Sequence, residues 1–243
     1  MINNEIRQIL TAYMISKRIS DGRFSPATLP KAQGVAKCGV VPWIRCKEII
    51  SCEVTENYTA EIQDIEGLNA SKSNLFAFGS LDALVESNSP EMINSLTSEK
   101  LQKNLSWPEI RIIHQKGTDS FVKYNWDARL FLSNSGGSHH FCAARYIASK
   151  MGQCIYLHGR LHHYYIDKDK LSALLVGNKL YLCHGESDIL YRSKWRVIPI
   201  EPTRDLNLFA VLIPIALETK LIRYVLDKAG FINLGAYLNS IAR

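Results

Sequence analysis

FLSNSGGSHHFCAARYIASKMG, residues 131–152, joins a strand-like run to a helix-like run through a turn that contains two glycines. The run 128–133 alternates as a strand does, and Ser138 is a residue type that commonly caps a helix N-terminus. Gly152 is placed to end the helix, as glycine often does. The apolar residues in between recur at helical spacing and predict one buried face: Phe141, Ala144, Ile147 or Ala148, and Met151.

The predicted start of this helix has the properties of an anion-binding site. The first N–H groups of a helix lack partners within the helix, and the helix dipole places partial positive charge there. Gly136 and Gly137 allow an anion to approach the backbone closely. His139 and His140 add hydrogen-bond donors, and Arg145 follows further along the helix. A purely structural turn, in which both histidines cap and pack, is the alternative that the sequence leaves open.

The run GSHHFCAA, residues 137–144, resembles without gaps the box shared by the ParB and sulfiredoxin superfamily. Ser138 stands where sulfiredoxin has its cysteine, His139 where it has a histidine, and His140 where it has an arginine. The resemblance extends over residues 128–158. It implies an α+β chain with a small mixed-sheet core of the ParB/sulfiredoxin-like type and helical N- and C-terminal extensions.

That superfamily binds nucleotide phosphates at this box: ATP in sulfiredoxin and the related serine kinases, CTP in ParB. The resemblance therefore implies a nucleotide-binding protein, with phosphotransferase or NTP hydrolase activity as a further expectation. Reduction of a sulfinic acid is not expected, because Ser138 replaces the cysteine nucleophile. DNA segregation is not expected either, because the upstream box of ParB is missing before residue 128. The phosphate-binding residues implied are Gly136, Gly137, Ser138, His139, His140 and Arg145.

Phosphoryl transfer also needs a carboxylate that holds Mg²⁺ or orients the nucleophile. Asp127, at the start of the strand-like run, is the best-placed acidic residue, and an ordinary turn or strand-edge aspartate is the alternative. The expected catalytic residues are Asp127, His139 and His140, and the expected cofactor is Mg²⁺ bound with the nucleotide. Whether the chain is an enzyme stays open.

The rest of the chain mixes helical and strand patterns without a regular alternation, which favours an α+β architecture. Helices are expected at 3–19, 79–105, 167–175 and 205–242. One or two strands are expected within 48–66, and further strands at 110–114, 128–133, 154–158, 162–166, 179–184 and 195–200, with 154–166 forming a hairpin.

We expect three parts: an N-terminal helical and irregular extension (1–110), an α+β core (111–200) and C-terminal helices (201–243). Charge is distributed unevenly along the chain: +5 over 1–50, −7 over 51–110 and +8 over 111–243. This pattern is compatible with a protein that binds a phosphate-bearing ligand or a nucleic acid. An acidic segment that covers a basic face of the same chain would give the same pattern.

Bulk composition limits the cellular context. The six cysteines include no C-x-x-C pair, and a chain of 243 residues can build a core without disulfides, so we expect a reduced, cytoplasmic protein. The longest apolar run, 208–217, is too short to span a bilayer, and no secretory signal is visible, so no membrane partner is expected.

Two further readings stay open. Six of the seven histidines lie between 139 and 184, near Cys142, Cys154 and Cys183, but without the spacing of a common zinc motif, so no metal ligand is assigned.

The alternative function is a non-catalytic or toxic effector of a bacterial antiviral defence or toxin–antitoxin system. Its acidic middle and basic flanks would then bind a protein or nucleic-acid partner.

Overall fold

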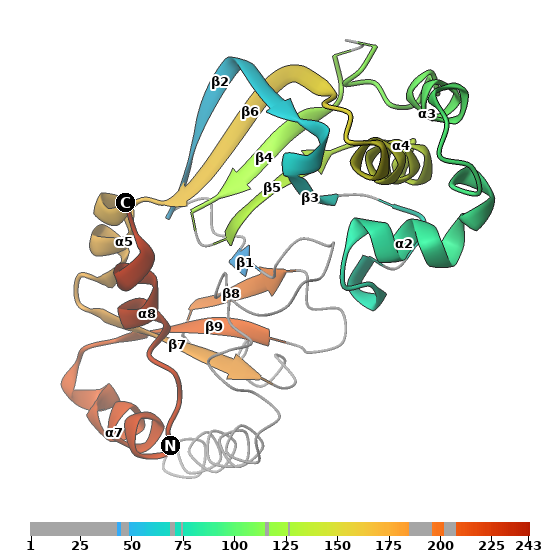
Figure 1. The fold of residues 1–243 in the computed structure, drawn as a ribbon. Helices are drawn as coiled ribbons and strands as arrows, with labels where there is room; N and C mark the ends of the chain where they lie inside the picture. Colours follow the sequence, from blue (N-terminus) through green and yellow to red (C-terminus); the bar gives the residue numbers. More distant parts are fainter. Residues whose placement is uncertain are drawn as a thin grey trace. The chain divides into compact units, whose positions relative to one another are not determined.

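A computed structural model of the chain describes residues 43–44, 49–68, 71–73, 75–114, 117–125, 127–184, 196–201 and 208–243. These residues divide into two compact units (Figure 1). The central unit takes residues 52–164. The terminal unit takes residues 165–243 together with the described residues between 43 and 51. The expected N-terminal helix at 3–19 lies outside the described residues.

The central unit contains a five-stranded mixed sheet in the order β2-β6-β4-β5-β3. Strand β5 is antiparallel to β4 and parallel to β3, while β4 is parallel to β6. The predicted α+β class is therefore confirmed. The strands are β2 (Ile50–Glu61), β3 (Ile65–Leu68), β4 (Ser120–Tyr124), β5 (Asp127–Ser133) and β6 (Tyr156–Ile166).

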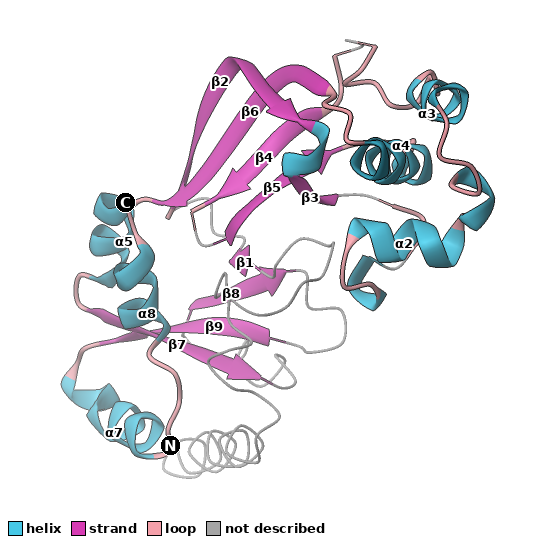
Figure 2. Ribbon diagram, in the orientation of Figure 1, coloured by secondary structure: helices cyan, strands magenta, loops and turns pink. Residues whose placement is uncertain are grey.

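Helix α4 (Ser138–Met151) is the centre of the helical layer in this unit, because it contacts both α2 (Leu81–Asn88) and α3 (Ser98–Leu105) (Figure 2). The side chains of Phe121 and Leu132 from the sheet and of Phe141, Ala144, Ile147 and Ala148 from α4 share one buried apolar cluster. Short 3-10 turns complete the unit: η3 (Ile62–Asp64), η4 (Leu75–Ala77) and η5 (Pro90–Met92).

The terminal unit contains a four-stranded antiparallel sheet in the order β1-β8-β9-β7. Its core includes Leu171, Tyr181, Val211 and Leu234, all of which are at most 1% exposed. The strands are β1 (Trp43–Ile44), β7 (Asn178–His184), β8 (Arg196–Glu201) and β9 (Leu208–Pro214). The helices are α5 (Lys168–Leu175), η6 (Leu217–Thr219), α7 (Lys220–Lys228) and α8 (Leu234–Ile241).

Several local predictions are confirmed. The segment 79–105 contains α2 and α3, and Ser80 caps α2 by accepting a hydrogen bond from the backbone N–H of Ala83. Helix α5 begins after Asp167, whose carboxylate accepts from two backbone N–H groups. Strand β5 matches the expected strand at 128–133, and β7 matches the one at 179–184.

Three local predictions are wrong. Residues 110–114 form turns, because the Asp119 carboxylate binds the Ile112 N–H and leaves Ile110 and Ile112 buried without a strand partner. Residues 156–166 form one continuous strand, β6, rather than a hairpin, and Gly159 lies inside it beneath the side chain of Ile112. Residues 208–214, expected within the C-terminal helices, form β9, an interior strand of the four-stranded sheet.

The two units also differ from the three expected parts. The expected boundary near residue 110 does not separate compact units, because β2 and β3 belong to the same sheet as β4, β5 and β6. Strands β7, β8 and β9 likewise place residues on both sides of position 200 in one sheet. Among the helices that the structure describes, none combines the length and apolar character needed to cross a membrane.

Candidate functional site

The Gly136–Gly137 turn links β5 to α4. The side-chain amide of Asn134 donates to the Gly136 carbonyl and to the Ser138 hydroxyl, both at 2.9 Å, and so closes the turn. Gly137 is the N-cap of α4 and has φ of 69°, whereas Ser138 is the first helical residue. The predicted capping role of Ser138 is therefore wrong, because its hydroxyl bonds Asn134 instead. Gly152 ends α4 with φ of 64°, as predicted.

A carboxylate from the same chain occupies the helix N-terminus. The backbone N–H of Gly137 donates to Oε2 of Glu109 at 3.2 Å, and Trp107 Nε1 donates to the same oxygen at 3.5 Å. A Cβ atom at Gly136 would lie 3.0 Å from that oxygen, so glycine permits the approach. The side chain of Glu109 is exposed. The turn thus binds an oxyanion, and this oxyanion is the carboxylate of a residue from the same chain.

The two histidines are held by hydrogen bonds on either side of α4. His139 bonds two serine hydroxyls, Ser73 at 3.0 Å through Nε2 and Ser89 at 2.6 Å through Nδ1. His140 Nδ1 bonds Oδ1 of Asn104 at 3.0 Å. The His140 ring also stacks on Trp107, with a centroid separation of 4.1 Å. These contacts tie α4 to neighbouring segments, and they occupy both ring nitrogens of His139 and Nδ1 of His140.

Arg145 does not face the turn. Its guanidinium donates to Asp82 at 2.6 Å, to the Ile65 carbonyl at 3.0 Å and to the Gln63 carbonyl at 3.3 Å. The side chain is only 15% exposed. The predicted phosphate contact is therefore replaced by a structural one, because these bonds direct the guanidinium toward η3, β3 and α2.

Asp127 is the first residue of β5 and pairs with Tyr124 of β4. Its side chain lies outside the described part of the structure. Its roles in catalysis and in magnesium binding therefore stay predictions, separate from the geometry of the turn.

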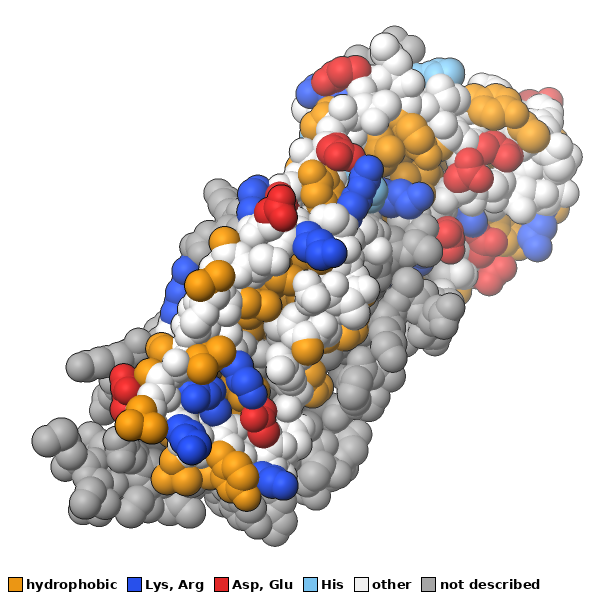
Figure 3. All heavy atoms as spheres, turned by 90° about the vertical axis from the view of Figure 1, so that its left-hand side faces the viewer, with side chains coloured by type: hydrophobic (Ala, Val, Ile, Leu, Met, Phe, Trp, Pro, Cys, Tyr) orange, Lys and Arg blue, Asp and Glu red, His pale blue; other side chains and the backbone are white. Residues whose placement is uncertain are grey.

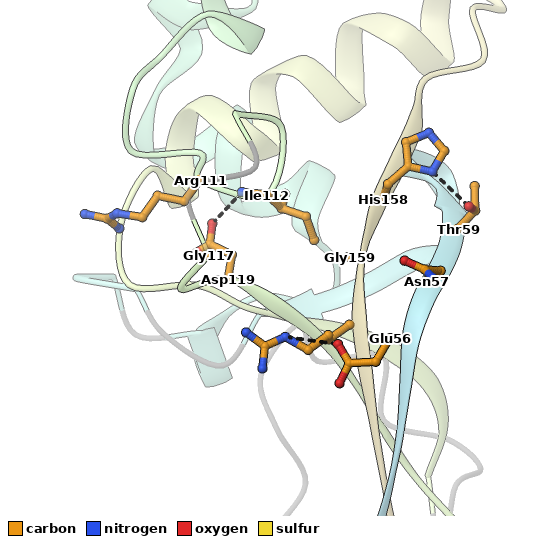
Figure 4. A pocket seen from close by; sticks show the side chains of 10 residues that line it. Glu56, Asn57, Thr59, Arg111, Ile112, Gly117, Asp119, His158 and Gly159 are labelled. Atoms are coloured by element: carbon orange, nitrogen blue, oxygen red, sulfur yellow. Dashed lines mark hydrogen bonds and ion pairs between the residues drawn. The ribbon is translucent and has the colours of Figure 1, made fainter.

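Two hollows lie in the central unit, with volumes of about 470 Å³ and about 320 Å³, and both are lined by Ile112 and His158. We refer to the two hollows together as the groove. Figure 4 shows the larger hollow between the loop that carries Arg111 and Asp119 and the strands that carry Thr59 and His158. Its lining is mostly polar and charged, whereas the smaller hollow is lined largely by apolar residues that include Leu105, Ile113, Ile155 and Tyr156.

Ser135 connects the groove to the turn. Its hydroxyl accepts a hydrogen bond from Arg111 at 2.5 Å, and its backbone N–H donates to Oδ1 of Asp119 at 3.4 Å. Burial raises the pKa of Asp119, and this effect exceeds the lowering by backbone hydrogen bonds from Ile112, Ser135 and Arg111. A carboxyl group with a raised pKa that lines a hollow beside an arginine is typical of a functional site.

The opposite wall supplies further polar groups. His158 Nδ1 bonds the Thr59 hydroxyl at 2.9 Å, so its other ring nitrogen is the one available to a ligand. Arg160 lies 3.8 Å from the Glu56 carboxylate, and its side chain is 51% exposed. None of these groove residues was among the predicted site residues, and His158 was considered only as one of the six histidines of the zinc alternative. The sequence signal nearest to them is the pair Gly117 and Asp119, a common turn composition.

Metal binding has no described site. Within the described ranges, no three or more His, Cys, Asp or Glu side chains gather closely enough to hold a metal ion. Cys142 is buried in the core, whereas Cys154 is exposed. The side chains of Cys183 and His184 lie outside the described part of the structure. The finding on metal binding therefore applies to the other histidines and cysteines of the zinc alternative and not to these two.

His140 should make stability depend on pH. Burial lowers its pKa below the ordinary 6.5, and His139 and Lys103 act in the same direction against an opposing effect of Glu109. The folded chain then binds this proton less readily than the unfolded chain, so the free energy of unfolding should decrease as pH falls below about 6.5. His140→Phe keeps a ring on Trp107 and should weaken this dependence. Urea unfolding at about pH 7.5 and about pH 5.5 measures it; equal pH dependence in both proteins would contradict the prediction.

The comparisons with known proteins yield a family match. No curated protein and no solved structure matches the chain. One family model matches residues 55–243, which include the turn, the groove and nearly all described elements. The chain therefore belongs to the family described as a family of unknown function (DUF6685).

Proposed function

We propose that this chain binds a nucleotide, ATP or CTP, with its phosphates at the Gly136–Gly137 turn and the rest of the ligand along the adjoining groove. The observation that carries the proposal is the hydrogen bond from the Gly137 N–H to the Glu109 carboxylate at 3.2 Å. A helix N-terminus that already accepts one oxyanion has the geometry for a phosphate oxygen. In the bound state the phosphate takes the place of Glu109.

The surroundings of the turn favour this exchange. Glu109 is exposed, so its carboxylate can return to water when a phosphate enters. Arg111 already reaches Ser135 in the turn, and a guanidinium can bind phosphate through two parallel hydrogen bonds. A triphosphate carries more negative charge than a carboxylate and gains more from the helix dipole and from Arg111.

The groove has room and chemistry for the remainder of the ligand. Each hollow falls within the range of typical small-ligand sites, which is roughly 300–1,000 Å³, at about 470 Å³ and about 320 Å³. The apolar hollow suits a base, which Tyr156, 63% exposed, can stack against. His158 and Arg160 line the polar hollow and suit the ribose and phosphates.

Magnesium would enter with the nucleotide, and turnover would need a carboxylate near the phosphates. Asp119 lines the polar hollow and contacts Ser135, so it is the described carboxylate with the best position for either role. Asp127, which the sequence suggested as the magnesium-binding or catalytic carboxylate, is the second candidate for these roles.

Replacing Glu109 should increase nucleotide affinity. Glu109→Gln removes a negative charge that competes with the phosphates, and we expect roughly tenfold tighter binding, since opposing like charges cost at least about 1.4 kcal/mol. The measurement is the thermal shift with ATP, CTP and pyrophosphate, each with magnesium, fitted over ligand concentration. Glu86→Gln, at an exposed site on α2, is the matched control and should leave affinity unchanged.

Two results would overturn the proposal. The first is the absence of any shift with these ligands in both the wild type and Glu109→Gln. The second is a shift that Glu109→Gln and Glu86→Gln affect equally, because the ligand would then bind away from the turn.

A further inference from the structure

Helix α7 and the preceding turn η6 expose a row of large apolar side chains. Among the described residues, Ile215, Leu217, Leu221 and Tyr224 are 54%, 84%, 61% and 58% exposed. Isolated exposed apolar residues are ordinary, but four within ten positions form a patch that is typical of an interaction surface. Figure 3 shows this side of the terminal unit, and hydrophobic and basic side chains lie close together in the lower part of the picture.

The side of α7 opposite the row is anchored to the rest of the terminal unit. The opposite face of α7 buries Ile222 and Leu226. The Asp227 carboxylate accepts hydrogen bonds from Tyr181 and Lys179 of β7, both at 2.9 Å. The Arg223 guanidinium donates to the carbonyls of Pro214 and Ala216 and so fixes the chain before α7. The exposed face is therefore presented by a well-anchored helix.

The exposed face has a symmetric spacing. Three members of the row and Lys228 follow one another at intervals of four, three and four residues: Leu217 at the start of η6, and Leu221, Tyr224 and Lys228 along one face of α7. Reversing the direction of the helix leaves this series of intervals unchanged. Two copies packed antiparallel about a two-fold axis therefore place Leu221 against Tyr224 of the other copy. They also place Leu217 against the aliphatic stem of Lys228 of the other copy.

The charges at the two ends of the row fit the same arrangement. Glu218 lies at the N-terminal end and Lys228 at the C-terminal end, and both are exposed. In the antiparallel pair each Glu218 lies beside Lys228 of the other copy, so two ion pairs flank the apolar contact. A parallel pair would set like charges side by side, which disfavours that arrangement.

We propose that the exposed face of η6 and α7 binds a second copy of this chain and forms an antiparallel, two-fold symmetric helix pair. The occupant is the same face of another molecule, because the symmetric row and the opposite end charges complement themselves. This inference concerns the terminal unit and does not depend on the proposed nucleotide site in the central unit.

The test is the molar mass of the full-length chain, measured by light scattering and sedimentation from about 1 to about 100 μM. The wild type should approach twice the 27.5 kDa of one chain at the upper end. Leu221→Asp should raise the dimer dissociation constant at least about a hundredfold, because it places two carboxylates in the apolar contact. Val176→Asp is the matched control, since Val176 is 75% exposed in the same unit but outside the row, and it should leave the dimer intact.

Charge exchange gives an independent check. Glu218→Lys and Lys228→Glu should each weaken the dimer about tenfold, because each sets like charges together at both ends, and the double variant should restore it. A wild type that stays monomeric over the whole range would overturn the proposal. So would a dimer that Leu221→Asp leaves unchanged, or a double variant as weak as the single ones.

Discussion

Replacing Arg145 by alanine should lower the free energy of unfolding by about 2–3 kcal/mol, because a mostly buried guanidinium loses hydrogen bonds to a half-exposed carboxylate and to two carbonyl oxygens. The Arg145 guanidinium binds Asp82 and the carbonyl oxygens of Ile65 and Gln63, and its side chain is only 15% exposed. Alanine leaves both carbonyls without this donor and Asp82 without its cation. Helix α4 then loses its polar link to η3, β3 and α2.

Urea unfolding followed by circular dichroism measures this loss. Lys150→Ala is the control on the same helix, because Lys150 is exposed, and it should change stability by no more than about 0.5 kcal/mol. Arg145→Lys should fall between the two, since an ammonium keeps the charge but cannot bind three acceptors with the same planar geometry. Equal stability of Arg145→Ala and Lys150→Ala would contradict the prediction.

The same variant separates the two roles considered for Arg145. A phosphate-binding arginine would leave the stability of the ligand-free chain nearly unchanged and would weaken nucleotide binding. A structural arginine gives the opposite result, and its contacts predict that result here. His139 is comparable, because both of its ring nitrogens bond serine hydroxyls from other segments.

Local signals were sufficient to predict helix α4. Glycines stand at both of its ends, and apolar residues at helical spacing face the core, so its limits follow from residues that are neighbours in sequence. The same reasoning predicted β5, β7, α2, α3 and α5. At the helix start the Gly137 N–H donates to the carboxylate of Glu109, and the binding of a phosphate there stays a prediction. That the oxyanion belongs to Glu109, 28 residues earlier, is a tertiary contact that spacing cannot predict.

The groove could not be predicted for a related reason. The segment 110–114 has the isoleucines of a strand, but backbone turn hydrogen bonds from Ile110 and Ile113 and the bond from the Ile112 N–H to Asp119 hold it as a loop. Thr59 and His158 are 99 residues apart and meet because β2 and β6 are neighbours in the sheet. The hairpin expected over 154–166 is instead the strand β6, and Gly159 inside it leaves room for the Ile112 side chain, whose Cδ1 is only 3.2 Å from where a Cβ atom would be.

Replacing Gly137 by alanine should lower the free energy of unfolding by about 2–4 kcal/mol, the sum of a left-handed backbone cost and an overlap cost. Gly137 has φ of 69°, which alanine adopts at a cost of about 1–2 kcal/mol. Its Cβ atom would also lie 2.9 Å from the carbonyl carbon of Glu109 and 3.0 Å from Cγ1 of Ile110. The backbone of residue 109 must therefore shift, and the hydrogen bond from the Gly137 N–H to the Glu109 carboxylate is lost with it.

Two further glycines separate these costs in the same urea experiment. Gly152→Ala, at the other end of α4, has φ of 64° and no atom within 4 Å of the added Cβ, so only the backbone cost of about 1–2 kcal/mol applies. The Cβ atom of Gly136→Ala would lie 3.0 Å from Oε2 and 3.2 Å from Cβ of Glu109, so Glu109→Ala in the same chain should remove part of its cost. The cost of Gly137→Ala should persist beside Glu109→Ala, because its clash is with backbone atoms. Equal costs for Gly137→Ala and Gly152→Ala would show that Glu109 does not approach the turn as closely as the 2.9 Å contact requires.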